Sequence, residues 1–206
     1  ICCTSSNAVA IVESLGVDRV ILLPDEYLTK NVATQTEVEV IAWKGRCEVH
    51  ERFTVEEIQQ YRSNIPDLVV LAHPECSPDL ISEADYTGST AGMIGYVKEN
   101  LPPRVMMVTE CSMSDNVAAE TQGVEFVRPC NICPHMKQIT LQNILESLQF
   151  MRYEITIPDS VAIRARKSVQ RMVDLRITGG GFSNGVTSEV IVEERDTVDL
   201  AVGLRV

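Results

Sequence analysis

The chain has 206 residues, and its 45% hydrophobic and 23% charged content is typical of a globular enzyme with one large or two small domains. The formal net charge of −11 excludes an extensive basic face, and with it nucleic acid or an anionic membrane as the main partner. No apolar run is long enough to cross a bilayer, and no signal peptide is recognisable.

The sequence begins at Ile1 rather than at a methionine, so we expect it to be a fragment of a longer protein. Its seven cysteines are an odd number without the other marks of a small secreted scaffold. They favour a reducing compartment with free or metal-bound thiols. Four of them are expected to be packing residues, because a free cysteine behaves as a small hydrophobe: Cys2, Cys3, Cys76 and Cys111.

Apolar periodicity and end signals divide the chain into alternating helices and strands. Ser5 and Ser6 are expected to cap the first helix, and Thr54-Val55-Glu56-Glu57 is a capping-box pattern that starts another. The apolar run Leu68–Ala72 predicts a strand buried in a parallel sheet. Helices are expected near 8–15, 25–33, 54–63, 139–151 and 158–175, strands near 19–23, 38–43 and 68–72, and a helix-strand-helix-strand series at 89–127. This alternation indicates an α/β fold with parallel sheets.

The chain contains an internal repeat whose matches include polar residues at turns. At an offset of 85 residues the matching segments are Arg19-Val20 with Arg104-Val105, Asn31-Val32-Ala33 with Asn116-Val117-Ala118, and Thr36 with Thr121. The same offset brings Thr4-Ser5 onto Ser89-Thr90 at helix N-termini, and Cys47 to within one residue of Cys133. We therefore predict two pseudo-equivalent units, and a third copy with a third cysteine in sequence before Ile1.

Cys130 and Cys133 lie in a Pro-punctuated turn before an amphipathic helix. Such a pair fits a cluster site, half of a metal site in a non-catalytic binding module, or a dithiol oxidoreductase with a redox disulfide. The repeat does not choose between the two thiols, because an offset of 85 from Cys47 falls at Ile132. Three thiolates from three units would suit a [4Fe–4S] cluster that leaves one iron open as a Lewis acid.

Two polar segments accompany these thiols. His73, Pro74 and Glu75 follow the apolar strand at its carboxyl end, where ligands of open α/β sheets bind. A histidine at a strand end is also often just a hydrogen-bonded core residue. His50 stands three residues after Cys47, where it either faces a cavity or supports the loop.

Five ordered motifs together closely resemble one family. They are Cys3-Thr4-Ser5-Ser6-Asn7-Ala8-Val9, Trp43-Lys44-Gly45-Arg46-Cys47-Glu48-Val49-His50, His73-Pro74-Glu75-Cys76, Gly88-Ser89-Thr90 and Cys130-Asn131-Ile132-Cys133-Pro134-His135-Met136-Lys137. The sequence from residue 1 to about Leu175 resembles quinolinate synthase, the NadA family. The resemblance implies pseudo-symmetric three-layer α/β/α domains, with short parallel sheets, around a central [4Fe–4S] cluster.

The resemblance also implies an activity: condensation of iminoaspartate with dihydroxyacetone phosphate to quinolinate, for NAD biosynthesis. It implies L-aspartate oxidase as a partner that supplies substrate, and a cytoplasmic location, or the plastid stroma in a plant. By their motifs, Cys47 and Cys133 look like cluster ligands, with the third ligand upstream of this sequence. Cys133 is favoured over Cys130 because the family's ligand lies three residues before the methionine.

Catalytic and substrate-binding roles follow from the same resemblance. Glu75 and His50 look catalytic, with Glu75 as general base or acid, because the reaction removes a proton from carbon and protonates leaving oxygens. Anionic substrates suit helix N-termini, where the alternative role of Ser and Thr is a plain cap. The expected substrate-binding residues are Ser5, His73, Pro74, Glu75, Ser89 and Thr90.

The expected organisation has four parts. Residues 1–52 form part of a second NadA-like repeat, 53–136 a third repeat, 137–175 C-terminal helices and 176–206 an atypical tail without assigned function. The helical apolar stripe between Ile139 and Met151 is expected to be core that closes the cavity. Lacking one repeat and one ligand, these residues alone are expected to be inactive.

Overall fold

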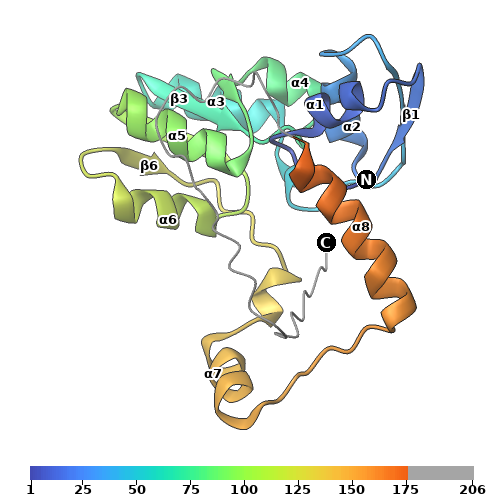
Figure 1. The fold of residues 1–206 in the computed structure, drawn as a ribbon. Helices are drawn as coiled ribbons and strands as arrows, with labels where there is room; N and C mark the ends of the chain where they lie inside the picture. The colour runs from blue at the N-terminus through green and yellow to red at the C-terminus, as the bar shows by residue number, and fades with distance from the viewer. Residues whose placement is uncertain (176–206) are drawn as a thin grey trace. The chain divides into compact units, whose positions relative to one another are not determined.

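The computed structural model of the chain describes residues 1–175, so the tail at 176–206 lies outside the described residues. Helices alternate with short strands, and every strand pair is parallel (Figure 1). The predicted α/β class with parallel sheets is therefore confirmed. The described residues divide into two compact units, one formed by Cys3–Gln138 and the other by Ile1–Cys2 with residues 139–175.

A two-stranded sheet opens the larger unit. Strands β1 (Arg19–Leu22) and β2 (Glu39–Ala42) pair in parallel, and the helices between and before them are α1 (Ala8–Ser14) and α2 (Glu26–Ala33). One face of this sheet is buried under both helices in a core of Ala8, Val12, Leu22, Leu28 and Val32. The elements match the predicted ones, except that α1 begins at Ala8 after Asn7, so Ser5 and Ser6 are not its cap.

A four-stranded sheet of order β4-β3-β5-β6 forms the rest of the larger unit. Its strands are β3 (Leu68–Ala72), β4 (Tyr86–Thr87), β5 (Arg104–Val108) and β6 (Glu125–Val127). Its helices are α3 (Val55–Asn64), α4 (Pro78–Ser82), α5 (Thr90–Asn100) and α6 (Ser112–Glu120). The predicted strand at 68–72 and the capping box of Thr54 with Glu57 are confirmed.

This larger sheet is buried on both faces, which makes the four strands and their helices a three-layer α/β/α arrangement. Alternate strand residues pack in opposite directions, as the two-residue period of a strand requires. One core cluster joins Val70, Met106 and Val108 to Ile58 of α3 and Leu80 of α4. The other joins Leu71, Val105 and Met107 to Met93 and Val97 of α5 and Val117 of α6.

The sequence repeat has a structural counterpart in two equivalent ion pairs. Arg19 Nε lies 2.8 Å from Glu39 Oε2 on β1 and β2, and Arg104 Nε lies 2.9 Å from Glu125 Oε2 on β5 and β6. The arginines are 85 residues apart but the glutamates are 86 apart, because each pair is aligned in its strand ladder. After the second strand the offset is therefore 86, which pairs Cys47 with Cys133 rather than with Cys130.

The two sheets differ in how their equivalent faces are covered. Met106 and Val108 on β5 have no exposed surface, whereas Ile21 and Leu23, their equivalents in the first unit, are 68% and 57% exposed. Ile41 and Trp43 add to this exposed apolar face. Parallel sheets are normally covered on both faces. In the first repeat unit only one face of the sheet is covered by helices, whereas in the second repeat unit both faces are.

This difference predicts unequal losses of stability. We expect Met106→Ala to lower the free energy of unfolding by about 2–5 kcal/mol, since it removes a fully buried side chain. Ile21→Ala, the matched control at the equivalent exposed position, is expected to change it by less than about 0.5 kcal/mol. Denaturant unfolding of the 206-residue chain measures both, and equal losses would contradict the burial pattern.

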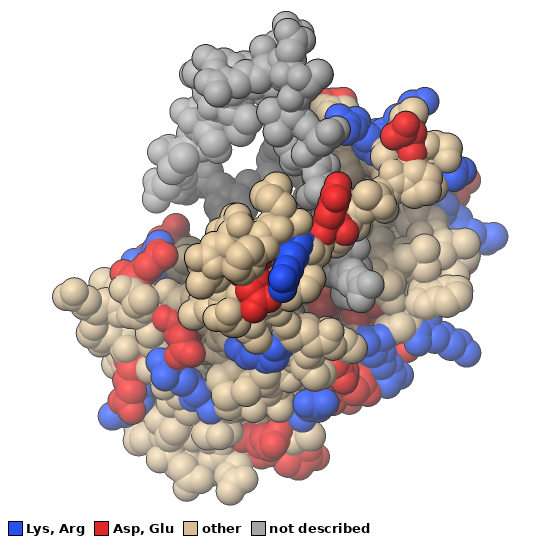
Figure 2. Space-filling view, turned by 90° about the horizontal axis from the view of Figure 1, so that it is seen from below, with Lys and Arg blue, Asp and Glu red and all other residues tan. Residues whose placement is uncertain are grey.

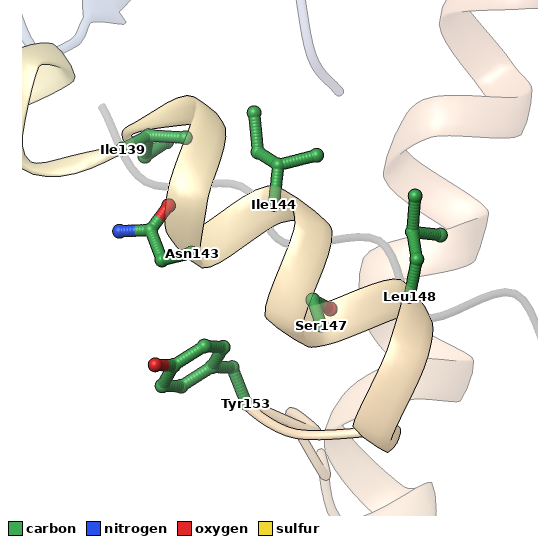
Figure 3. A pocket seen from close by; sticks show the side chains of 6 residues that line it. All are labelled: Ile139, Asn143, Ile144, Ser147, Leu148 and Tyr153. Atoms are coloured by element: carbon green, nitrogen blue, oxygen red, sulfur yellow. The ribbon is translucent and has the colours of Figure 1, made fainter.

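The smaller unit carries α7 (Leu141–Phe150) and α8 (Asp159–Asp174). Both helices were predicted, but the apolar stripe of α7 is exposed, so the prediction that it forms core is wrong for the structure described here. Figure 3 shows Ile144 and Leu148 projecting from α7, with Tyr153 in the loop that follows the helix. These three residues line an open pocket of about 380 Å³ with Ile139, Asn143 and Ser147.

Two surface properties bear on possible partners. On the face drawn in Figure 2, Lys and Arg side chains are interspersed with Asp and Glu rather than gathered in one basic patch. None of the described helices combines the length and the apolar character that a bilayer span requires.

Candidate active site at the carboxyl edge of the larger sheet

Polar residues follow each strand of the larger sheet at the same edge. His73 and Glu75 come after β3, and Thr109 comes after β5, whose last residue Val108 is the ladder partner of Ala72. Because all four strands are parallel, the segment of Ser89 after β4 and that of Cys133 after β6 also leave this edge. Ligands of open parallel sheets bind at such carboxyl edges.

His50 is the centre of the site. It begins the short 3₁₀ helix His50–Arg52 and is buried, with only 7% of its surface exposed. Its Nδ1 lies 3.1 Å from Glu75 Oε2, and its Nε2 lies 3.1 Å from Thr109 Oγ1. Nδ1 has no well-aligned hydrogen bond, so its attraction to Glu75 is electrostatic rather than directional. The imidazole of His50 stacks on that of His73, with ring centroids 4.7 Å apart.

The neighbours of His50 decide its charge. Burial disfavours the imidazolium, but the Cys47 thiolate and the Glu75 carboxylate outweigh burial and raise the pKa of His50 to about 9. Burial also opposes ionisation of Cys47 and Glu75, yet His50 outweighs it and holds the pKa of each below its ordinary value. The arrangement therefore favours a charged His50 and an ionised Glu75 at neutral pH.

His73 is held in the opposite state from His50. Burial and, next, the positive charge of His50 lower the pKa of His73 to about 4, so its ring is neutral near pH 7. The backbone N–H of Glu75 donates to His73 Nδ1 at 3.4 Å. The neutral ring then carries its proton on Nε2, which makes His73 a hydrogen-bond donor for a substrate oxygen.

Cysteine sulfur lies within the same site. Among the described residues, ligand atoms of Cys47, His50 and Glu75 lie within 4.8 Å of one another, a grouping that could hold a metal ion. Cys133 is not part of that group, but it carries a free thiol and packs, as Cys47 does, against the core cluster of Val70, Met106 and Val108. Two half-buried free thiols on equivalent loops therefore border one core.

Comparison with known proteins identifies the family. The family model described as "Quinolinate synthetase A protein" matches residues 1–174. The chain belongs to the quinolinate synthetase A family. The predicted resemblance to this family is thereby confirmed, and residues 1–174 include every residue of the candidate site.

Curated relatives of the quinolinate synthetase A family agree with this result. The chain is 62% identical over 173 residues to "Quinolinate synthase 2" of Mesorhizobium japonicum, covering 84% of this chain and 53% of the relative. It is 57% identical over 175 residues to "Quinolinate synthase" of Agrobacterium fabrum, covering 85% and 51%. For "Quinolinate synthase" of Xylella fastidiosa strain 9a5c, identity is 54% over 173 residues, covering 84% and 51%. The chain thus spans about half the length of these relatives.

Two predictions about cysteine need correction within this family fold. Cys111 and Cys130 form a disulfide, so Cys111 is not merely a packing residue, and Cys130 pairs with Cys111 rather than with Cys133. The expectation that the cysteines are all free or metal-bound is wrong for this pair. Cys76 behaves as predicted: it is buried in the core, and burial raises the pKa of its thiol to about 12.

The hydroxyl residues expected to bind substrate sit at two unlike helix ends. Ser89 is the N-cap of α5 and its Oγ accepts a hydrogen bond from Gly92 N at 3.1 Å, so Thr90 begins the helix. Ser5 lies in a turn before the seven-residue α1, whose N-cap is Asn7. Pro74 is buried between His73 and Glu75. Their roles toward substrate stay predictions.

Two residues of the site were missed in the sequence. Thr109 could have been found, because it directly follows an apolar run that parallels the strand before His73. Asp25 is buried, with 5% of its surface exposed, and its carboxylate accepts hydrogen bonds from Leu28 N at 2.7 Å and Cys47 N at 3.1 Å. Asp25 and Cys47 are 22 residues apart in the sequence, so no local sequence pattern predicts their contact.

Proposed function

We propose that this chain is part of a quinolinate synthase that condenses iminoaspartate with dihydroxyacetone phosphate to quinolinate, in NAD biosynthesis in the cytoplasm. The observation that carries the proposal is the group of Cys47, His50 and Glu75 at the carboxyl edge of a parallel sheet, in a chain of this family. An enzyme that oxidises L-aspartate would be the partner that supplies the imine.

The donor atoms fit a [4Fe–4S] cluster with an open iron. Cys47 and Cys133 carry half-buried free thiols on equivalent loops, and His50 favours the thiolate of Cys47 by lowering its pKa. Cys130, bonded to Cys111, offers no thiolate. Cys47 and Cys133 would therefore hold the cluster, with a third ligand from outside this sequence. The bound cluster would supply Lewis acidity for loss of water from the substrate.

The protein groups supply proton transfer and orientation. Glu75 is ionised and partly exposed, so it can take a proton from substrate carbon and return it to a leaving oxygen. His50 is too buried to meet substrate freely, so its role is to position Glu75 by charge, with Thr109 fixing the far side of its ring. Neutral His73 would donate from Nε2 to a substrate carboxylate or carbonyl.

Anion binding is the remaining requirement, since both substrates are negatively charged. The N-terminus of α5 offers backbone N–H groups and the exposed Thr90 hydroxyl, while Ser89 caps the helix. Ser5 would contribute a second hydroxyl from its turn before α1. Figure 1 shows α5 in the green part of the chain, near β3, and its residues Met93 and Val97 pack with Leu71 of that strand.

The test uses a full-length enzyme, meaning a chain of the relatives' length that contains this sequence. Purified without oxygen, it is expected to contain iron and acid-labile sulfide and to form quinolinate from the two substrates. The 206-residue chain alone is expected to form none. Zinc in place of iron would favour the binding module, and absence of both metals with disulfide exchange would favour the oxidoreductase. Quinolinate formation by the 206-residue chain would overturn the requirement for a third ligand.

A further inference from the structure

Both cysteine loops are attached to the strand end beside them by the same backbone hydrogen bond. In the first unit Glu26 N donates to Gly45 O at 2.7 Å, and in the second Cys111 N donates to Asn131 O at 3.0 Å. The donors are 85 residues apart and the acceptors 86, the offsets found in the strands. The attachment of these loops is therefore a shared property of the two units.

The side chains that reinforce this attachment differ. In the second unit the Cys111–Cys130 disulfide closes the loop that carries Cys133. In the first unit there is no disulfide at the equivalent place, and the buried Asp25 carboxylate instead accepts from the N–H of Cys47 itself. The loop also lies close to Pro24, since a Cβ at Gly45 would collide with the Pro24 carbonyl oxygen.

We propose that Asp25 is a positioning residue for the cluster ligand Cys47, whose loop it fixes through the Cys47 N–H. One oxygen of the carboxylate, Oδ1, caps α2 by accepting from Leu28 N, and the other, Oδ2, accepts from Cys47 N. The helix thus serves as the rigid base for the ligand loop. The proposal rests on the proposed function only in naming Cys47 a ligand; the fixing of the loop is independent of it.

The Asp25→Asn variant separates the two contacts of the carboxylate. Asparagine is as good a helix cap as aspartate, but it has one oxygen and cannot accept from both N–H groups. Its NH₂ group would then face one of these donors. In the 206-residue chain, we expect amide hydrogen exchange in residues 44–48 to be about 10- to 100-fold faster, with exchange in α2 unchanged.

Asp85→Asn is the control. Asp85 Oδ2 also accepts a backbone hydrogen bond, from Val70 N at 2.7 Å, and it pairs with Arg62 at 2.7 Å rather than with a cysteine loop. This variant is expected to speed exchange near β3 and to leave residues 44–48 unchanged. If Asp25→Asn leaves 44–48 unchanged, or speeds α2 and the loop equally, Asp25 is at most a helix cap and the proposal fails. Should Asp25→Asn not fold, Asp25→Ser, a shorter cap, carries the same expectations.

Iron retention in the full-length enzyme links the loop to the cluster. Asp25→Asn is expected to lose iron to a chelator at least severalfold faster than the parent, while Asp85→Asn loses it at the parent rate. Equal rates in all three would show that the loop contact does not position the ligand. A full-length enzyme that never holds iron would refute the proposed cofactor, and the exchange measurement would still decide the role of Asp25.

Discussion

Alanine in place of Cys47 is expected to leave a full-length enzyme without iron–sulfur absorbance and without measurable quinolinate formation. Loss of an outer-shell partner typically lowers metal affinity by about 10- to 100-fold, and loss of a ligand itself costs more. The half-buried Cys47 thiol has no substitute nearby, because Cys76 is buried in the core with a pKa of about 12. Absorbance spectra and iron per chain are the measurements.

The control for this experiment is Cys76→Ala. It removes a cysteine of the core cluster, and it is expected to lower stability modestly while the cluster is retained. A Cys47→Ala enzyme that kept both iron and activity would show that Cys47 is not a ligand. Loss of iron in both variants would mean that the cluster responds to general loosening of the fold.

Glutamine in place of Glu75 is expected to lower kcat by about 10²- to 10⁴-fold while iron content stays at the parent level. Glutamine keeps the size of the side chain but cannot take a proton. It also removes the negative charge beside His50, 3.1 Å away, so the pKa of His50 should fall in the variant. Steady-state kinetics with iron analysis on the same preparation separates this variant from a ligand variant.

The pKa of Glu75 also predicts how the activity of the parent enzyme depends on pH. His50 holds the pKa of Glu75 below its ordinary value of 4.5, so the carboxylate is ionised throughout the neutral range and protonates only as pH falls below that value. Activity of the parent should therefore show no acid limb from Glu75 near pH 6.

Glu83→Gln is the control for the loss of kcat in Glu75→Gln. Glu83 accepts a hydrogen bond from Gln59 outside the site, so this variant should leave kcat unchanged. Parent-like kcat in Glu75→Gln would exclude Glu75 as the base.

Elements with strong local signals were predictable from the sequence. The strand Leu68–Ala72 is a wholly apolar run, and the capping box of Thr54 announces α3, so both were found with their observed starts. The histidine and glutamate of the site were found because they follow that strand. β4, with only Tyr86 and Thr87, is too short to show a period, and α4 was missed for the same reason.

Long-range contacts were not predictable in this way. Disulfide connectivity cannot be deduced from cysteine spacing. The bond between Cys111 and Cys130, 19 residues apart, could therefore be identified only from the structure. The contact of Asp25 with Cys47 exists because β1 and β2 pair in parallel, so that the residues after each strand lie at the same edge of the sheet. The apolar stripe of α7 was predicted to be core but is exposed, because helical periodicity identifies an apolar face but not what covers it.

Each of the two cysteine loops is held by an equivalent backbone hydrogen bond, so positions in one loop can be matched to positions in the other. Through the offsets of 85 and 86 residues, Cys111 and Cys130 correspond to Glu26 and Lys44. The pair E26C and K44C is therefore the place in the first repeat unit to test for an equivalent cross-link, without changing Cys47. A covalent closure there would hold the loop irrespective of pH, unlike the carboxylate that holds it now.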